Sequence, residues 1–160
     1  MRVKLKYLPN FDYTKIIDLY AGTTPFSYNE GLLFCDVVDL SVTSDNGKSW
    51  TAHSFFYNDT ALLQVNTLKI KDNTPMTSAF SGCKSLSKVG EIIGKPSDIT
   101  TTFKNCNYLK KIPYIDTSLV KSLANTFYGC WWTEDWTELN NWDLSNVTNI
   151  SNAFYECYDL

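Results

Sequence analysis

The side chains with the most reactive chemistry in this sequence are five cysteines and a single histidine. Zinc sites favour ligands in pairs two to four residues apart, whereas the last four cysteines recur at spacings of 23, 24 and 27 residues. We therefore expect no metal and interpret these thiols as a buried column of small apolar side chains. Disulfides between neighbouring copies remain an alternative, because equivalent positions of stacked units lie within bridging distance. The four cysteines are Cys83, Cys106, Cys130 and Cys157.

Hydrolytic chemistry would depend on very few groups. A Ser–His–Asp or Cys–His mechanism would rest on His53 alone. This histidine is expected on the second strand of a hairpin, as a surface or packed residue. A glycosidase would need paired carboxylates, for which the candidates are Glu134, Asp135 and Glu138. The sequence shows no second segment that could form the opposite wall of a substrate cleft. The sequence therefore predicts a protein that is not an enzyme and has no cofactor.

An aromatic segment is the best candidate for a binding site. Trp131, Trp132 and Trp136 crowd one segment together with Glu134 and Asp135. Exposed aromatic side chains act as anchors for proteins and stack on sugar faces. The alternative is structural, since Trp131 or Trp132 could fill the core in place of a leucine that this segment lacks.

The composition limits the classes of partner. The chain has 160 residues, 15% of them aromatic, and a net charge of −3 without a long basic run. Nucleic-acid binding needs a basic surface that neutralises phosphates, so no such partner is expected. Neither a signal peptide nor an apolar stretch of membrane-spanning length is visible, and we expect no membrane insertion.

The elements that position these residues follow from an internal repeat. Four F-x-x-C motifs recur every 23 to 27 residues, within the period of about 20–29 residues of leucine-rich repeats. An apolar residue four positions before each phenylalanine predicts one face of a short helix. Alternating apolar residues predict strands near residues 68–70, 92, 112–115 and 142–144. The predicted repeat core comprises Phe80, Cys83, Phe103, Cys106, Phe127, Cys130, Phe154 and Cys157.

These patterns predict an α/β repeat solenoid over residues 63–160. It would be a leucine-rich-repeat-like stack of about four copies, each with a short strand and a short helical turn. Leucines follow three residues after most of the cysteines, but the third copy has Thr133 there. A β-rich module over residues 1–62 would precede the stack as a cap or docking unit.

The N-terminal module carries one recognisable turn. Asn46-Gly47 between alternating runs is a strong hairpin signal. The same hairpin resembles an Asp-box at Thr43, Asp45, Gly47, Ser49 and Trp50. Asp-boxes recur in sialidases, but a propeller needs several blades, and this chain has room for one box. We interpret the segment as a structural hairpin.

The last copy, residues 139–160, resembles the BspA-like leucine-rich repeat family. The resemblance lies in Trp142 and Asp143, then Val147 and Thr148, and the final F-x-x-C-x-x-L at Phe154. It covers residues 63–160 and is looser in the first two copies. Family members resemble surface adhesion and host-interaction molecules and also occur in phages. The resemblance implies no catalytic residues.

Two functions are compatible with these observations. The first is a non-enzymatic recognition or adhesion protein that presents a repeat surface to a protein or glycan. The second is a structural or assembly component of a virion, such as a phage head or tail protein. Cell surface or virion surface is the expected location. We also expect self-association, partner capping or fraying at the C-terminal repeat, because the last unit leaves its apolar face open.

Overall fold

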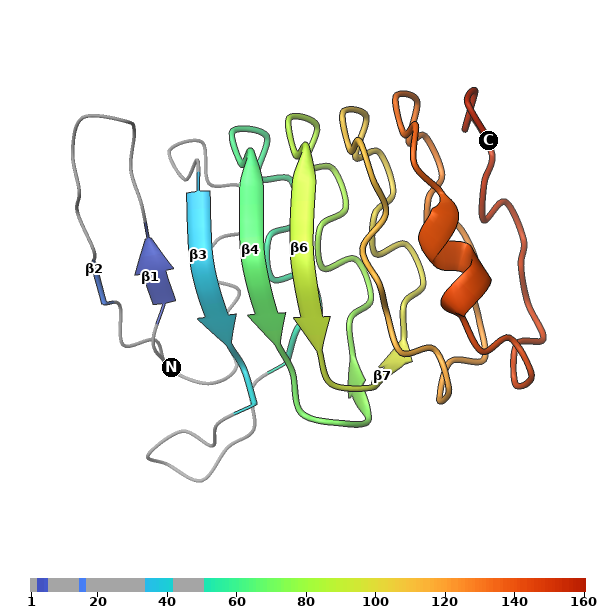
Figure 1. The fold of residues 1–160 in the computed structure, drawn as a ribbon, viewed down its shortest axis with the longest axis horizontal. Coiled ribbons are helices and arrows are strands. Elements are labelled where there is room, and N and C mark those ends of the chain that lie inside the picture. Colours follow the sequence, from blue (N-terminus) through green and yellow to red (C-terminus); the bar gives the residue numbers. More distant parts are fainter. Residues whose placement is uncertain (1–2, 6–14, 17–33, 42–50) are drawn as a thin grey trace.

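Short parallel strands and stacked turns make up the molecule (Figure 1). The computed structural model describes residues 3–5, 15–16, 34–41 and 51–160. One five-stranded sheet has the order β2-β1-β3-β4-β6, and β5 and β7 form a second, two-stranded sheet. The strands are β1 (Val3–Leu5), β2 (Lys15–Ile16), β3 (Phe34–Asp39), β4 (Gln64–Lys69), β5 (Thr74–Pro75), β6 (Lys88–Ile93) and β7 (Pro96–Asp98).

The centre of the larger sheet is parallel. Strands β3, β4 and β6 pair in register, so that Val38 lies opposite Leu68 and Leu68 opposite Ile92. All three side chains are buried. The β1 strand pairs antiparallel to both β2 and β3. Because β3 precedes residue 63, the sheet runs without interruption across the boundary expected between an N-terminal module and the repeats.

Five equivalent turns lie behind the sheet and give the fold its regularity. We number them turn 1 (residues 52–59), turn 2 (76–83), turn 3 (99–106), turn 4 (123–130) and turn 5 (150–157). Within a turn, backbone hydrogen bonds join residues three apart, such as Ala79 N–H to the Met76 carbonyl at 2.9 Å. Between turns, an N–H group donates to the carbonyl of the residue just before its equivalent in the next turn, such as Phe80 N–H to the Thr102 carbonyl at 2.9 Å.

The predicted α/β repeat solenoid, a leucine-rich-repeat-like stack of strands and helical turns, is wrong. The described residues contain no α-helix, and their one helical element is the 3-10 helix η1 (Thr137–Asn141). Small parallel sheets joined by turns replace the expected alternation of strands and helical turns. The physical reason lies in the backbone of the turns: two residues in each have positive φ, for example Ser78 at 58° and Gly82 at 79°. A right-handed helix cannot include such residues.

Two of the four expected strands are also missing. Strands β4 and β6 form around residues 68–70 and 92 as predicted. Residues 112–115 form no strand, since Pro113 occupies the interior of the segment and has no N–H to donate to a ladder. Only an isolated bridge joins Lys111 to Asp135 here. Residues 142–144 also form no strand, and η1 occupies the chain directly before them.

A column of phenylalanine rings fills the space between the turns and the sheet. Successive rings lie 5.2 to 5.9 Å apart and within 15° of parallel. The first four are fully buried, whereas the last is partly buried. Offset aromatic stacking adds to the free energy of burying such rings. The members are Phe56, Phe80, Phe103, Phe127 and Phe154.

The first ring of this column was not predicted. Phe56 belongs to turn 1, which lies inside the region assigned to the N-terminal module. Its turn ends at Asp59 and not at a cysteine, and for that reason the F-x-x-C search missed it. The predicted Asp-box hairpin, at residues 43–50, lies outside the described residues. Among the residues that are described, no helix is long and apolar enough to span a bilayer.

Candidate functional site

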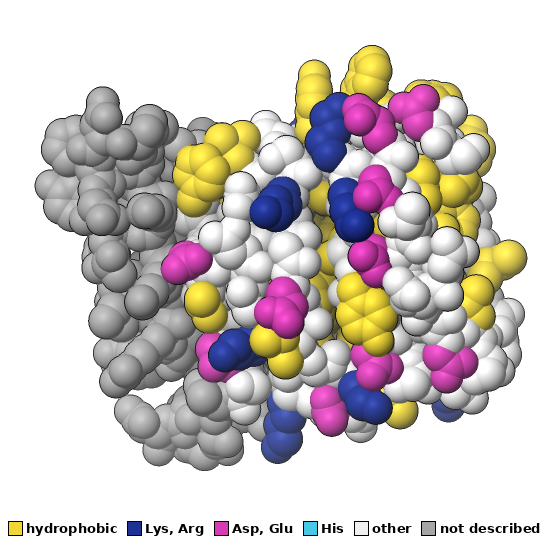
Figure 2. Space-filling model, viewed as in Figure 1, with side chains coloured by type: hydrophobic (Ala, Val, Ile, Leu, Met, Phe, Trp, Pro, Cys, Tyr) yellow, Lys and Arg dark blue, Asp and Glu magenta, His cyan; other side chains and the backbone are white. Residues whose placement is uncertain are grey.

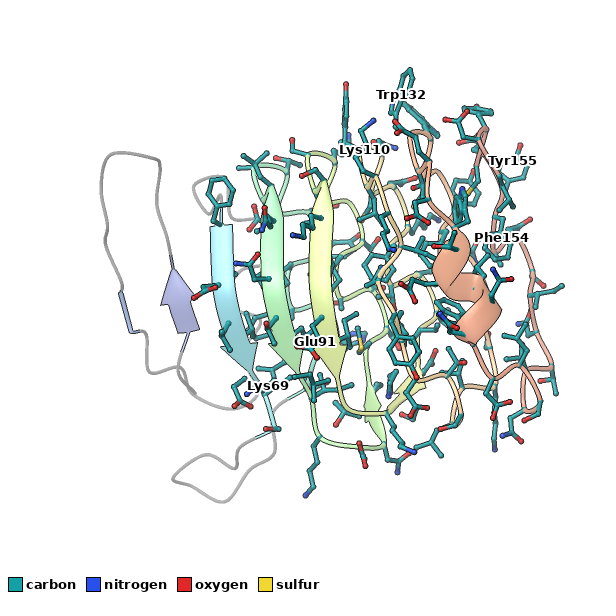
Figure 3. The ribbon with its side chains drawn as sticks, in the orientation of Figure 1. Lys69, Glu91, Lys110, Trp132, Phe154 and Tyr155 are labelled. Carbon is teal, nitrogen blue, oxygen red and sulfur yellow. The ribbon has the colours of Figure 1, made fainter. Side chains whose placement is uncertain are left out.

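Large aromatic side chains gather on the outside of turns 3, 4 and 5. Five of them are 41% to 72% exposed, which is unusual for tryptophan and tyrosine in such numbers. Hydrophobic side chains project beyond the upper edge of the face in Figure 2, and Figure 3 places Trp132 at that edge. We call this surface the aromatic ridge and define it as Tyr108, Tyr128, Trp131, Trp132, Tyr155 and Tyr158.

Backbone hydrogen bonds fix the loops that carry the ridge. Trp132 N–H donates to the Asn107 carbonyl at 3.1 Å, so the loops after turns 3 and 4 are joined directly. The buried Asn107 side chain donates to the Gly129 carbonyl at 2.8 Å and ties its loop to turn 4. A loop with its polar groups satisfied in this way presents its side chains in a fixed arrangement.

The expected core role of Trp131 or Trp132 is not observed. Thr133 itself occupies the vacant leucine position and is fully buried. Its hydroxyl donates to the Leu109 carbonyl at 2.7 Å, which satisfies the one polar group that this position buries. Trp131 and Trp132 are 41% and 51% exposed and remain outside.

Contacts among the ridge side chains order them further. The rings of Tyr128 and Tyr155 stack with centroids 5.0 Å apart. The Lys104 ammonium lies 4.8 Å from the centroid of the Tyr128 ring, within the range of a cation–π interaction. The Trp131 indole N–H donates to Glu156 at 3.3 Å. Three of the six ridge side chains, Tyr128, Trp131 and Tyr155, are therefore held by contacts before a partner binds, which lowers the entropy that they lose on binding.

Equivalent positions elsewhere in the chain show that the fold does not need these aromatics. The two residues that follow the end of turn 1 are Thr60 and Ala61, and those after turn 2 are Lys84 and Ser85. Their backbones make the same kind of loop with small or polar side chains. Tyr108, Trp131, Trp132 and Tyr158, at these two positions after turns 3 to 5, thus exceed what packing requires, which points to a role at the surface.

The other residues predicted for this site have different roles. Glu134 is exposed and forms an ion pair with Lys110 at 2.7 Å beside the ridge. Asp135 accepts hydrogen bonds from the Thr137 hydroxyl and N–H, which with the Lys111 ammonium lower the pKa of its carboxyl to about 2. Trp136 points inward.

Trp136 is part of the core at this end of the molecule. Its ring packs edge-on against Phe127 and Phe154, at 5.5 and 5.7 Å between centroids. Its indole N–H donates to the Thr133 carbonyl at 3.0 Å. Sequence reasoning assigned three tryptophans to one binding segment, and the structure separates two exposed rings from this packed one.

The repeated cysteines form a regular internal array of free thiols. Each donates its S–H to the phenylalanine carbonyl of the preceding turn, at sulfur–oxygen distances of 3.0 to 3.2 Å. Burial raises the pKa of Cys83, Cys106 and Cys130 well above the usual range. The pKa of Cys157, which is only partly buried, rises to about 11. Within the described ranges, no three potential metal-ligating side chains gather in one cluster.

A buried carboxyl takes the place of the thiol in turn 1. Asp59 is fully buried, and burial raises its pKa to about 7. Its Oδ1 accepts a hydrogen bond from Leu62 N–H at 3.2 Å, whereas its Oδ2 has no hydrogen-bond partner. The negative charge of Asp59 contributes to the raised pKa of Cys35 and Cys83, so all three groups share one desolvated region. The sequence signal that could have revealed turn 1 is the spacing of 24 residues between Phe56 and Phe80, which falls within the spacing of the later phenylalanines.

Of the remaining candidates for catalysis, the structure brings Asp135 and Glu138 together at the surface, where both pair with Lys111. His53 is exposed and lies in a turn, not on a hairpin strand as expected. Glu138 forms an ion pair with Lys111 at 3.3 Å. The nearest other predicted carboxylate, Asp135, pairs with the same lysine at 3.2 Å. These ion pairs lie at the surface, where they contribute little to stability.

One comparison with known proteins gives a match. Residues 95–160 match a family model described as Mycoplasma protein of unknown function, DUF285. The match covers less than half of the chain, and it includes turns 3 to 5 and the entire aromatic ridge. No curated protein matches the sequence, and no solved structure matches the fold.

Proposed function

We propose that this chain is a non-enzymatic recognition protein that binds a protein or glycan partner through the aromatic ridge. The observation that carries the proposal is the contrast between turns. In the two positions that follow each turn, turns 3 to 5 carry exposed aromatic residues (Tyr108, Trp131, Trp132 and Tyr158), whereas turns 1 and 2 have small or polar residues there.

The chemistry of the ridge suits recognition. Tryptophan and tyrosine offer large rigid faces with a polar atom at the edge, and they dominate binding energy at many interfaces. Tyr128 and Tyr155 are already stacked, and Trp131 is held by Glu156. A partner would therefore meet these three rings already ordered, which reduces the entropy lost on binding.

Charged groups beside the rings would orient a bound partner. Lys104 lies over Tyr128, and Lys110 and Glu134 pair close to the loop of Trp132. Figure 3 shows Lys110 and Trp132 projecting at the same end of the molecule, with Tyr155 nearby. Sugar rings stack on aromatic faces while their hydroxyls bond to such charged groups, and protein partners use the same combination at interface rims.

The resemblance of the C-terminal residues to BspA-like proteins supports the same proposal. That family resembles surface adhesion and host-interaction molecules, and the C-terminal residues match a family model from mycoplasmas. We therefore place the proposed recognition role at a cell surface.

A glycan array and an affinity capture with the intact chain test this proposal. The ridge variant combines Tyr108→Ala and Trp132→Ala, whose side chains are 55% and 51% exposed. The matched control is Tyr114→Ala, which removes a tyrosine that is 47% exposed away from the ridge. We expect the ridge variant to lose at least about tenfold in affinity for any ligand found, as hot-spot aromatics do, while the control binds normally. Equal binding by the two variants would refute the ridge as the binding surface.

A further inference from the structure

Two rings of the aromatic ridge are open to a ligand. Tyr108 and Trp132 stand at the second position after turns 3 and 4 and are 55% and 51% exposed. Among the described residues, neither ring makes an aromatic contact or a side-chain hydrogen bond, whereas Tyr128 and Tyr155 stack on each other. A further turn lies on either side of turns 3 and 4, so this exposure does not arise at an open end of the stack.

Unpaired lysines accompany these rings. Lys84 directly follows turn 2 and is exposed, and Lys104 in turn 3 holds its ammonium 4.8 Å from the centroid of the Tyr128 ring. Neither lysine forms an ion pair within the part of the chain that the structure describes. Backbone hydrogen bonds stack the two turns on each other, for example from Gly82 N–H to the Lys104 carbonyl at 2.8 Å. The ridge thus has two free positive charges at its turn 2 and turn 3 side.

This positive charge is local. Residues 84–111 contain six lysines and two acidic residues, a net charge of +4, although the whole chain has a net charge of −3. Residues 112–160 contain one lysine and seven acidic residues, a net charge of −6. Figure 2 shows basic side chains next to hydrophobic ones near the upper edge of the face. An anionic ligand would therefore be attracted to one side of the ridge.

Two carboxylates on the other side of the ridge are already engaged. Glu134 pairs with Lys110 at 2.7 Å, and Glu156 accepts the indole N–H of Trp131 at 3.3 Å. Their negative charge is thus partly offset or used to hold a ring. The two unpaired lysines are the charged groups that remain for a ligand.

The combination of rings and lysines favours a sugar chain over a protein surface. The cores of protein interfaces are poor in lysine, because an ammonium group is strongly hydrated and costly to desolvate. Sugar hydroxyls can replace that water as hydrogen-bond partners of the ammonium. The C–H face of a sugar ring also packs well against the negative face of an aromatic ring.

We infer that the aromatic ridge binds an acidic glycan, a chain of sugar rings that bears carboxylate or sulfate groups. The inference rests on the proposed recognition function and specifies its ligand. Successive turns carry Tyr108 and Trp132, so neighbouring sugar rings would stack on the two side chains in order. The anionic groups would accept charge-assisted hydrogen bonds from Lys84 and Lys104.

A glycan array with the intact chain tests the class of ligand. The array carries glycans with uronate, sialate or sulfate groups beside neutral glycans of the same sugar backbone. We expect the acidic glycans to bind at least about tenfold more tightly than their neutral counterparts. Added sodium chloride should weaken this binding, because salt screens exposed charges. Equal binding of acidic and neutral glycans, or no glycan binding at all, would overturn the inference.

Lysine variants locate the anionic groups. Lys84→Gln combined with Lys104→Gln should weaken binding of an acidic glycan from the array by about tenfold and leave binding of its neutral counterpart unchanged. The matched control combines Lys69→Gln and Lys71→Gln, which removes the same charge at the opposite end of β4, where Figure 3 places Lys69. The control should bind normally. An equal loss in the two variants would show an effect of net charge alone and would overturn the inference.

The ridge variant with Tyr108→Ala and Trp132→Ala separates this inference from the proposed function. Capture of a protein partner that the ridge variant loses, without any binding of acidic glycans, would overturn the acidic glycan and leave the recognition function in place. Binding of acidic glycans that the ridge variant retains in full would refute the ridge as the binding surface and the inference with it.

Discussion

The buried carboxyl of Asp59 makes the stability of this protein depend on pH near neutrality. It occupies the position at which the later turns have a cysteine, and its Oδ2 has no hydrogen-bond partner. A charge without a full set of partners is unfavourable in a desolvated region. Two substitutions isolate its effect. Asp59→Asn keeps the shape and removes the charge, and Asp59→Cys restores the F-x-x-C motif of the other turns.

The magnitude follows from the pKa. Burial raises the pKa of Asp59 from 3.8 to about 7, which corresponds to about 4 kcal/mol. Because the pKa is higher in the folded state, the folded chain binds the proton more tightly than the unfolded chain. The stability from this group is therefore fully present below about pH 4 and is lost as the pH rises to about 7.

Urea unfolding of the wild type and Asp59→Asn across this pH window measures the effect. The difference in free energy of unfolding should be small near pH 4. It should then grow to at most about 4 kcal/mol in favour of the variant above pH 7. Taking the difference removes the contributions of other groups, such as Asp135, whose pKa is lowered and which acts in the opposite direction. A difference that stays constant from about pH 4 to pH 8 would refute the reasoning. Asp59→Cys should be at least as stable as Asp59→Asn at neutral pH, because a thiol suits this position.

Three further predictions concern packing and accessibility. Phe103→Ala should reduce the free energy of unfolding by about 3–5 kcal/mol, and Phe154→Ala by clearly less, because its ring is only partly buried; equal losses in urea unfolding would contradict this. In thiol titration of the native protein, Cys157 should react before Cys106, which is fully buried, and a reversed order would count against the structure at this end. Gly90→Ala should lower stability by about 1–3 kcal/mol, measured in the same way, since an added Cβ would collide with the Asn66 carbonyl oxygen.

Much of the core could be predicted from the spacing of the F-x-x-C motifs. Residues at a constant offset in a periodic sequence occupy equivalent places. The four predicted phenylalanines accordingly stack in one column. The equivalence is not complete in burial, since Phe154, Cys157 and Leu160 are less buried than Phe103, Cys106 and Leu109.

The helical interpretation failed because an apolar pair four residues apart is not specific to helices. In these turns Met76 and Phe80 both point into the core, yet the chain between them passes through a residue with positive φ. The signal that excludes a helix was present in the sequence. Serine, threonine, asparagine or glycine stands two positions before each phenylalanine of turns 1 to 4 and two positions after it, and asparagine and glycine favour this conformation.

The surface could be predicted less well than the core. Period and apolarity cannot distinguish a tryptophan that packs from one that is exposed, because both have the same side chain. The outcome depended on Thr133, whose hydroxyl finds the Leu109 carbonyl and so makes a buried threonine acceptable. With that position filled, Trp131 and Trp132 stay outside, and Trp136, which follows Thr133 by three residues, packs against the core.

The uniformity of the five turns gives the variable positions their meaning. Backbone pairing, positive φ and the phenylalanine column recur in each turn, so these features specify the fold and cannot distinguish one turn from another. The turns differ in side chains that the repeated features do not specify. These are the carboxyl of Asp59 in turn 1 and the exposed aromatic rings of turns 3 to 5.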